Sequence, residues 1–413
     1  MPGAGGGPVH APFSFSRVAA GTWLAYASYG VLLAVLPFVE LELGGGPLLA
    51  TLVLGAPLAS QTLASYGWGW LSDRRGGRRG LLVVATALQA PIFLLLPLGG
   101  AVELFVLRVL QSALFGSVVL ATTLATEEAG RSAGPRLGWL QFASSGGMLL
   151  GVVASVPLLS GPTFRFDSTG GWSLVGLLAE LTAVAAVAYA LAGDLPHRRA
   201  PRGPAGAGSH LRREVLELAG ATTAVATFRY MAVSAVPVYL AATLARQGFF
   251  GVPFNEDQQL AVWLAVSSLF NLAAAPLSGR LAEPVASRRW VLVLSASAYA
   301  AIWVALYAVP NYAVTFGVWV VPVAVFFTVA GVREATDAST PEERGRAVGL
   351  MTAAFNFGGL AGAVVAGVVL SLGVGIVPMF GLSAVGAVGA ALLWVPVVRR
   401  LPPVRPGPRT SGS

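Results

Sequence analysis

The sequence predicts an all-α membrane protein with twelve transmembrane helices, built as two pseudo-symmetric six-helix bundles with both termini in the cytoplasm. Of its 413 residues, 55% are hydrophobic and only 11% are charged, against roughly 25% charged in soluble proteins. Uncharged runs long enough to cross a bilayer recur along the chain, and the basic residues gather between them. Because soluble cores cannot hide so many apolar residues, the bilayer is the expected solvent.

Each span is predicted from an apolar run of about 20 residues, the length that crosses about 30 Å of hydrocarbon. Two runs have double length, and the turns that divide them are expected at Pro310-Asn311 and at Gly373–Gly375, because proline and glycine punctuate helices. Two spans carry one charge each, Glu180 and Arg229. The runs are 18–39, 43–72, 80–102, 109–126, 137–164, 171–192, 219–242, 258–279, 290–332 and 347–398.

The basic residues predict the orientation, since loops rich in them stay in the cytoplasm. All 26 basic residues are Arg, and with a cytoplasmic N-terminus only Arg165 and Arg246 fall in outer loops. This asymmetry explains the net charge of +8. The basic loops are expected to face anionic lipid headgroups rather than nucleic acid. We expect a monomeric, multi-pass protein of the cell membrane.

Several classes of function are excluded by residues that the chain lacks or misplaces. It has no Cys, which excludes disulfides, thiol nucleophiles and Cys-based metal sites. The absence of Lys removes the phosphate-binding lysine of an ATP-driven pump. The three His residues, His10, His197 and His210, all lie in the expected cytoplasmic tail or linker. We therefore expect no enzyme, no metal and no cofactor.

Residues 193–214 form the only long polar stretch and predict a flexible linker between halves 1–192 and 215–413. The two halves repeat each other at a nearly constant offset, and charges align as well as apolar residues, which predicts a pseudo-two-fold axis along the membrane normal. Offset +210 relates Gly69, Asp73, Arg78 and Arg79 to Gly279, Glu283, Arg288 and Arg289; offset +211 relates Gly138, Gly147 and Gly151 to Gly349, Gly358 and Gly362; offset +215 relates Glu127, Glu128 and Arg131 to Glu342, Glu343 and Arg346; and offset +200 relates Pro37 to Pro237.

A charged loop with fixed glycine spacing joins the second and third predicted helices. It reads Gly69-Trp-Leu-Ser-Asp73-Arg74-Arg-Gly76-Gly-Arg78-Arg79, and it resembles the G-x-L-x-D-R-x-G-R-R signature of the major facilitator superfamily. A degenerate copy, Gly279-Arg-Leu-Ala-Glu283 followed by Arg288 and Arg289, lies where that family has its second copy. Gly77 and Pro284 depart from the signature, since basic residues usually occupy those places. The resemblance covers the whole chain in architecture.

The charged loops are expected to form a cytoplasmic gate, because pairs between the two halves must break when that side opens. The resemblance implies that Asp73 meets the start of helix eleven, where Arg344 and Arg346 lie. It also implies that Glu283 meets Arg131 or Arg136 at the start of helix five. The basic residues of the first loop are expected to reach Glu127 and Glu128. The alternative is that these Arg residues only determine topology.

Ionisable residues inside spans cost about 2.5–3.5 kcal/mol each on insertion scales and therefore indicate a use. Arg108, followed by Gln111, resembles the R-x-x-Q-G motif of proton-coupled drug efflux members, with Ser112 in place of Gly. The resemblance implies that helices one, four, seven and ten line a central cavity, so that Arg108 and Arg229 face it from opposite halves. Two such residues can clamp a carboxylate or phosphate. The alternative is buried Arg bonded to backbone carbonyls or a local acid.

Other polar residues in the spans are weaker candidates. Tyr26, Tyr29 and Tyr230 are expected to add aromatic and hydroxyl contacts to the cavity, although helical aromatics often serve packing alone. Glu180 is central in helix six, where it could exchange protons with solvent or only make an interhelical hydrogen bond. Gln141 and Asn271 are expected to make interhelical hydrogen bonds.

The function predicted is secondary transport by alternating access, coupled to protons or another ion, with a small anionic or polar metabolite as solute. Drug efflux is the alternative, although Val152 replaces the proline of the antiporter motif that Gly138, Gly147 and Gly151 otherwise resemble. The simpler interpretation of those glycines is close helix packing. A second alternative, from another class, is a non-transporting receptor or scaffold.

Overall fold

The computed structural model describes residues 13–42, 47–75, 77–98, 100–129, 133–155, 169–193, 213–235, 256–309, 311–340 and 343–400, and these are helical almost throughout. The N-terminal group of helices is α1 (Phe15–Glu42), α2 (Pro47–Arg75), α3 (Arg78–Ala87), α4 (Gln89–Leu95), η1 (Leu96–Leu98), α5 (Ala101–Phe115), η2 (Gly116–Val118), α6 (Val119–Ala129), α7 (Ala133–Ser155) and α8 (Thr169–Ala190). The C-terminal group is α9 (Arg213–Val233), α11 (Glu256–Ala282), α12 (Val285–Ala308), α13 (Tyr312–Trp319), α14 (Val323–Ala338), α15 (Arg344–Ser371) and α16 (Ile376–Arg400).

Nine helical stretches within the described residues are long and apolar enough to cross a membrane. Some combine successive helices: α3, α4 and η1 form the span Arg78–Leu98, and α13 with α14 forms Tyr312–Ala338. Three more long helices, α1, α2 and α9, have 28, 29 and 21 residues. The chain is therefore a multi-pass membrane protein.

The turns that divide the two double-length runs lie where proline and glycine predicted them. Asn311 precedes α13 and caps it, because its side-chain oxygen accepts a hydrogen bond of 2.9 Å from the Val314 backbone nitrogen. Gly373 separates α15 from α16 with φ of +75°, a left-handed conformation that glycine adopts at little cost. Pro310 lies outside the described residues.

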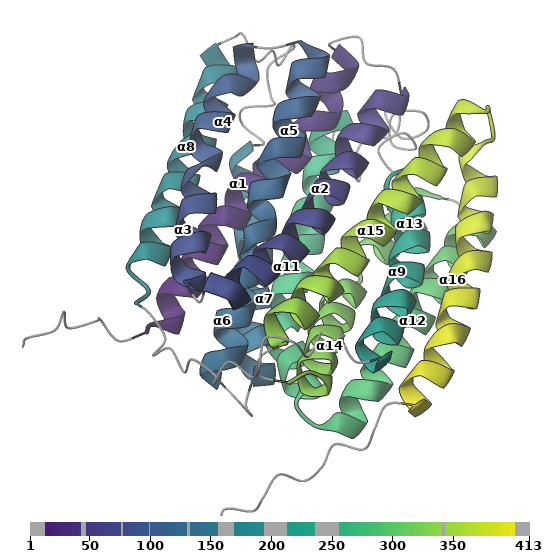
Figure 1. Cartoon of the computed structure of the whole chain (residues 1–413). Helices are drawn as coiled ribbons and strands as arrows, with labels where there is room; N and C mark the ends of the chain where they lie inside the picture. Colours follow the sequence, from purple (N-terminus) through teal and green to yellow (C-terminus); the bar gives the residue numbers. More distant parts are fainter. Residues whose placement is uncertain are drawn as a thin grey trace, which may run out of the picture.

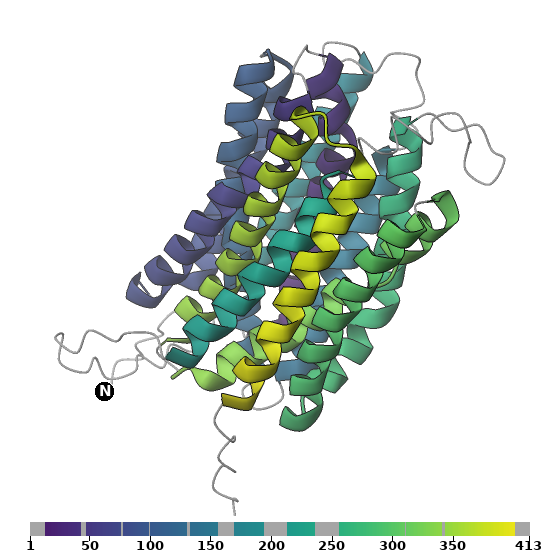
Figure 2. The same cartoon turned by 90° about the vertical axis from the view of Figure 1, so that its right-hand side faces the viewer.

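The two groups of helices lie against each other, and Figures 1 and 2 show the long, tilted helices of both groups side by side. Within the N-terminal group α1 packs on α7 and α8, and within the C-terminal group α9 packs on α15 and α16. Between the groups, α2 packs on α15 and α7 packs on α11. Each contact in one group has a counterpart in the other, as the internal repeat predicts.

Glycines allow the closest of these contacts. A Cβ atom added to Gly151 on α7 would overlap the Ala27 carbonyl oxygen of α1. A Cβ atom added to Gly362 on α15 would overlap the Thr227 carbonyl oxygen of α9. The predicted close packing by small residues is therefore confirmed for both copies.

Candidate functional site

A cavity of about 500 Å³ lies between the two groups and takes lining residues from both. Its wall is mainly apolar, with aliphatic and aromatic side chains, and uncharged polar side chains lie among them. The N-terminal group supplies Tyr26, Tyr29, Gln61 and Gln141, and the C-terminal group supplies Arg229, Tyr230, Asn271, Tyr299 and Asn356. Such a chamber, apolar with a few polar groups, suits one small solute.

Arg229 is the single charged residue among the described residues that line the cavity. Its guanidinium carbon lies 4.7 Å from the ring centre of Tyr230, 5.4 Å from that of Phe355 and 5.7 Å from that of Tyr299. Within the described part of the chain no carboxylate forms an ion pair with it. Neutral aromatic residues thus surround this cation.

Arg108 does not line the cavity, so the predicted two-arginine clamp is not formed. Its side chain is buried in the N-terminal group, where it donates hydrogen bonds to Gln111 and, over 2.9 Å, to the Ser112 hydroxyl. Gln111 also lies behind the wall and donates a 2.8 Å hydrogen bond to Gln89. The Tyr29 ring, centred 5.1 Å from the Arg108 guanidinium carbon, faces the cavity in its place.

All three predicted tyrosines, Tyr26, Tyr29 and Tyr230, line the cavity. Tyr29 is stacked on Phe115 with ring centres 4.7 Å apart. Glu180 is elsewhere: its side chain is exposed on the outer surface of α8 and is not among the lining residues. Its position therefore gives no support to a proton-carrying role in the chamber, because α8 turns other residues toward the core.

Several lining residues had only a weak signal in the sequence. Tyr299 and Trp303 lie on α12, which is not one of the helices that the family resemblance assigned to the cavity, yet both line it. Gln141 and Asn271 were expected to serve interhelical contacts, and both line the cavity instead. The Asn271 side-chain oxygen has no hydrogen-bond partner within the described part of the chain. Polar residues in apolar runs are the one signal that pointed to these two.

The Asp73 loop meets the start of α15, as predicted. A Cβ atom added to Gly69 would lie 2.9 Å from the Gly345 carbonyl oxygen, and one added to Gly345 would lie 2.5 Å from Asp73 Oδ1. Asp73 accepts from the Arg346 backbone and is paired over 3.0 Å with Arg78 of its own loop rather than with Arg344. Burial raises the pKa of the Asp73 carboxyl above its ordinary value, and Arg78 offsets this in part.

Glu283 makes the equivalent contact from the other group. Its Oε2 atom accepts a 2.9 Å hydrogen bond from the Gly134 backbone nitrogen at the start of α7. The expected partner Arg136 pairs over 3.2 Å with Glu128 instead, and Arg131 lies outside the described residues. Both acids thus face the N-terminal end of a helix in the opposite group, where free backbone N–H groups favour an anion. We call this end of the molecule the anchor end.

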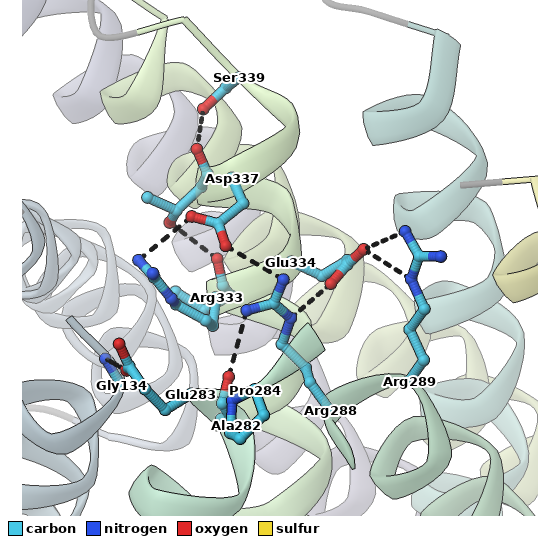
Figure 3. A network of polar contacts seen from close by, with 12 residues as sticks. Gly134, Ala282, Glu283, Pro284, Arg288, Arg289, Arg333, Glu334, Asp337 and Ser339 are labelled. Atoms are coloured by element: carbon cyan, nitrogen blue, oxygen red, sulfur yellow. Dashed lines mark hydrogen bonds and ion pairs between the residues drawn. The ribbon is translucent and has the colours of Figure 1, made fainter. Parts of the chain in front are cut away.

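A network of arginines and acids joins α12 to α14 at the anchor end (Figure 3). Arg288 donates to Glu334 and is paired with Asp337 over 3.0 Å, and Arg289 is paired with Glu334 over 3.3 Å. Arg333 completes the network through a 3.2 Å pair with Asp337. Glu334 and Asp337 were not predicted, although two acids at the end of a span were a visible signal.

This network corrects the alignment of the repeat. Arg78 forms an ion pair with Glu127 in the N-terminal group, and Arg288 forms one with Asp337 in the C-terminal group. Both members of the pair are therefore related by the offset +210. The offset +215, which matched Glu127 and Glu128 to Glu342 and Glu343, does not describe these contacts. Glu343 is instead 3.7 Å from Arg346.

The remaining loop residues make local contacts at the same end. The Arg74 guanidinium lies 4.0 Å from the ring centre of Trp70. Arg79 donates a 3.2 Å hydrogen bond to the Ala190 carbonyl at the end of α8. Gly279 is packed against Gly134 and Gly138 of α7. Gly76 lies outside the described residues.

Two groups of helices enclose one shared chamber and meet along α2–α15 and α7–α11, an arrangement typical of membrane transporters rather than of enzymes. The sequence pattern of the Major Facilitator Superfamily matches residues 18–249 and again 218–413, and the chain belongs to that family. No curated protein matches the chain.

Solved structures share the fold at low sequence identity. The human organic anion transporter MFSD10 (TETRAN) is similar, with a TM-score of 0.69, 16% identity and coverage of 92% of this chain and 98% of that one. A point mutant of the nucleoside transporter NupG is also similar, with a TM-score of 0.65, 14% identity and coverage of 93% of this chain and 99% of that one.

Proposed function

We propose that the protein is a secondary transporter of small organic anions that works by alternating access. Halves 1–192 and 215–413, joined by the linker 193–214, would move about the central cavity, with twelve spans in the plasma membrane and both termini in the cytoplasm. The observation that carries the proposal is Arg229, a cation without a carboxylate partner among the described residues, in the wall of a chamber shared by both groups.

The surroundings of Arg229 support an anionic solute. A charge without a counter-ion inside an apolar chamber is costly, and a bound carboxylate would supply that counter-ion. Three aromatic rings lie close to the guanidinium, and Tyr230 also accepts a hydrogen bond from it. The planar fork of N–H groups suits in-plane, bidentate bonds to a carboxylate. The aromatic wall favours a planar apolar body, and an aromatic monocarboxylate combines these features.

The contacts at the anchor end support alternating access. Asp73 and Glu283 each hold a helix of the opposite group, so this end is closed. Opening this end requires both contacts to break. Because a receptor or scaffold has no need for matched contacts that can break, this symmetry favours transport over that alternative.

The coupling ion and the efflux alternative are further parts of the proposal. Proton coupling stays a prediction: among the described lining residues there is no Asp, Glu or His to carry the proton. The positive charge of Arg229, the one charge in the described wall, favours an anionic metabolite over lipophilic cations as the solute. The description of MFSD10 as an organic anion transporter agrees with this preference. NupG, a nucleoside transporter, shares the fold as well.

Arg229→Ala tests the proposal directly. We expect the affinity for an aromatic monocarboxylate, measured by calorimetry on purified protein, to fall at least about tenfold, because one charge-assisted hydrogen bond is worth that much. Arg229→Lys should bind with intermediate affinity, since it keeps the charge but loses the planar geometry. The uncharged amide of the same compound should bind the wild type and Arg229→Ala alike.

Arg213→Ala is the matched control, because Arg213 lies on the same helix with its side chain 84% exposed. It should leave the affinity unchanged. Equal affinity of Arg229→Ala and wild type for every anion tested would refute the anion site. Transport of the bound anion into proteoliposomes then distinguishes a transporter from a receptor.

A further inference from the structure

Arg108 is a buried cation without an anionic partner in the described part of the chain. Its side chain is 2% exposed, and its hydrogen-bond partners Gln111, Ser112 and Tyr29 are all neutral. The Nε atom has no partner there. None of the ion pairs between described residues includes Arg108, and Glu103, on the same helix, bonds to the Gly100 backbone instead.

Tyr29 separates this cation from the cavity. Its ring lies 5.1 Å from the Arg108 guanidinium carbon, while the same residue lines the chamber that Arg108 does not reach. The ring is held in place by Phe115, which stacks on it at an interplanar angle of 15°, and by Tyr26, whose ring meets it edge-on at 6.3 Å. Tyr29 thus covers one charge of the N-terminal group.

We propose that Arg108 is a covered second anion subsite, and that Tyr29 makes the transporter selective for monoanions over dianions by closing it. The inference rests on the proposed function, because it assumes that Arg229 binds the first carboxylate. A solute with two carboxylates would have to bury the second without a cationic partner, at a large cost in lost hydration. Removal of the cover should let that carboxylate reach Arg108. Selectivity here comes from a blocked contact, not from an added one.

Tyr29→Ala is the test, and the ligands are α,ω-dicarboxylates of increasing chain length beside the monocarboxylates of the same lengths. At least one dicarboxylate should bind Tyr29→Ala about tenfold or more tightly than it binds the wild type, the factor expected for one new charge-assisted contact. The monocarboxylates should gain no affinity, and some loss is expected because Tyr29 also lines the cavity. Calorimetry on the purified full chain measures both series.

Two variants make the result specific. Tyr26→Ala removes the same side chain from the same aromatic cluster but uncovers no cation, so it should not gain dicarboxylate affinity. The double variant Tyr29→Ala, Arg108→Gln keeps a polar group at position 108 and should lose the gain. Folding of each variant is verified by monocarboxylate binding through Arg229.

The outcomes separate this inference from the proposed function. If no dicarboxylate gains affinity in Tyr29→Ala, or if the gain survives Arg108→Gln or is matched by Tyr26→Ala, the covered subsite is refuted while monocarboxylate binding at Arg229 persists. If wild-type protein binds no anion through Arg229, the proposed function itself fails.

Discussion

Asp73 and Glu283 illustrate how the same acidic residue type can work against backbone instead of a basic side chain. The sequence and its family resemblance place both acids correctly at the junction of the two groups, but they predict arginine side chains as the partners. In the structure Glu283 accepts from the Gly134 amide, and Asp73 accepts from the Arg346 backbone. Backbone N–H groups at a helix end belong to almost any residue type, so a sequence gives no signal that they act as hydrogen-bond partners. The Tyr29 cover over Arg108 was missed for a related reason, because it depends on side-chain direction.

At this scale we predict that Asp73→Asn lowers the transport rate more than it lowers affinity. The neutral amide keeps the size of the side chain but weakens the contact with α15 and the pair with Arg78, so the balance between open and closed anchor ends shifts. Uptake by proteoliposomes should fall several-fold, while calorimetric affinity stays within about threefold. Glu217→Gln, in the exposed pair with Arg213, should change neither. A loss of affinity that matches the loss of rate would argue against a gate.

Helix pairs are where sequence and structure agree best. Gly151 meets α1 and Gly362 meets α9, and these glycines are related by the offset +211. The repeat could be recognised from glycine spacing because a close contact between two helix backbones leaves no room for a side chain and therefore requires glycine. Hydropathy located the nine spans found in the described residues, because lipid requires a long, mostly apolar stretch of helix. Neither glycine spacing nor hydropathy indicates that α12 contributes to the cavity wall, so the sequence did not predict it.

For these helix pairs we predict that Gly151→Ala and Gly362→Ala both destabilise the protein. The added methyl group overlaps a carbonyl oxygen, and overpacking of this kind costs roughly 1–3 kcal/mol. Gly220→Ala, at a position of α9 where a Cβ atom meets nothing within 4 Å, should be neutral or stabilising by about 0.5–1 kcal/mol, because alanine favours helix. Thermal unfolding in detergent gives all three signs. A destabilised Gly220→Ala would show that helix packing is not the cause.

Across the whole molecule, the two groups make matching helix contacts. They differ in the cavity, where the one charged residue of the described wall comes from the C-terminal group. The family, nine of the spans and the anchor end were predictable from composition, spacing and the repeat, all of which are properties of long stretches. The single-cation wall of the described cavity was not predictable, because it depends on which of the two arginines inside predicted spans, Arg108 or Arg229, reaches the wall.

At the scale of the membrane we predict that anion uptake responds to an imposed pH gradient. Each elementary charge costs about 2.3 kcal/mol per 100 mV to move against the potential, and a proton carried with a monoanion cancels that cost. Proteoliposomes with a pH gradient and no potential should accumulate the anion, and a protonophore should abolish the accumulation. Uptake that follows only an imposed potential would instead indicate uniport of the charged solute.

Arg229 and the rings of Tyr230, Tyr299 and Phe355 all belong to the C-terminal group. A solute bound there would stay attached to the C-terminal group throughout the transport cycle. Movement of the N-terminal group relative to it would expose the solute first to one side of the membrane and then to the other. Mutations in the C-terminal group should then decide what is carried, and mutations in the N-terminal group how quickly, apart from the Tyr29 exclusion.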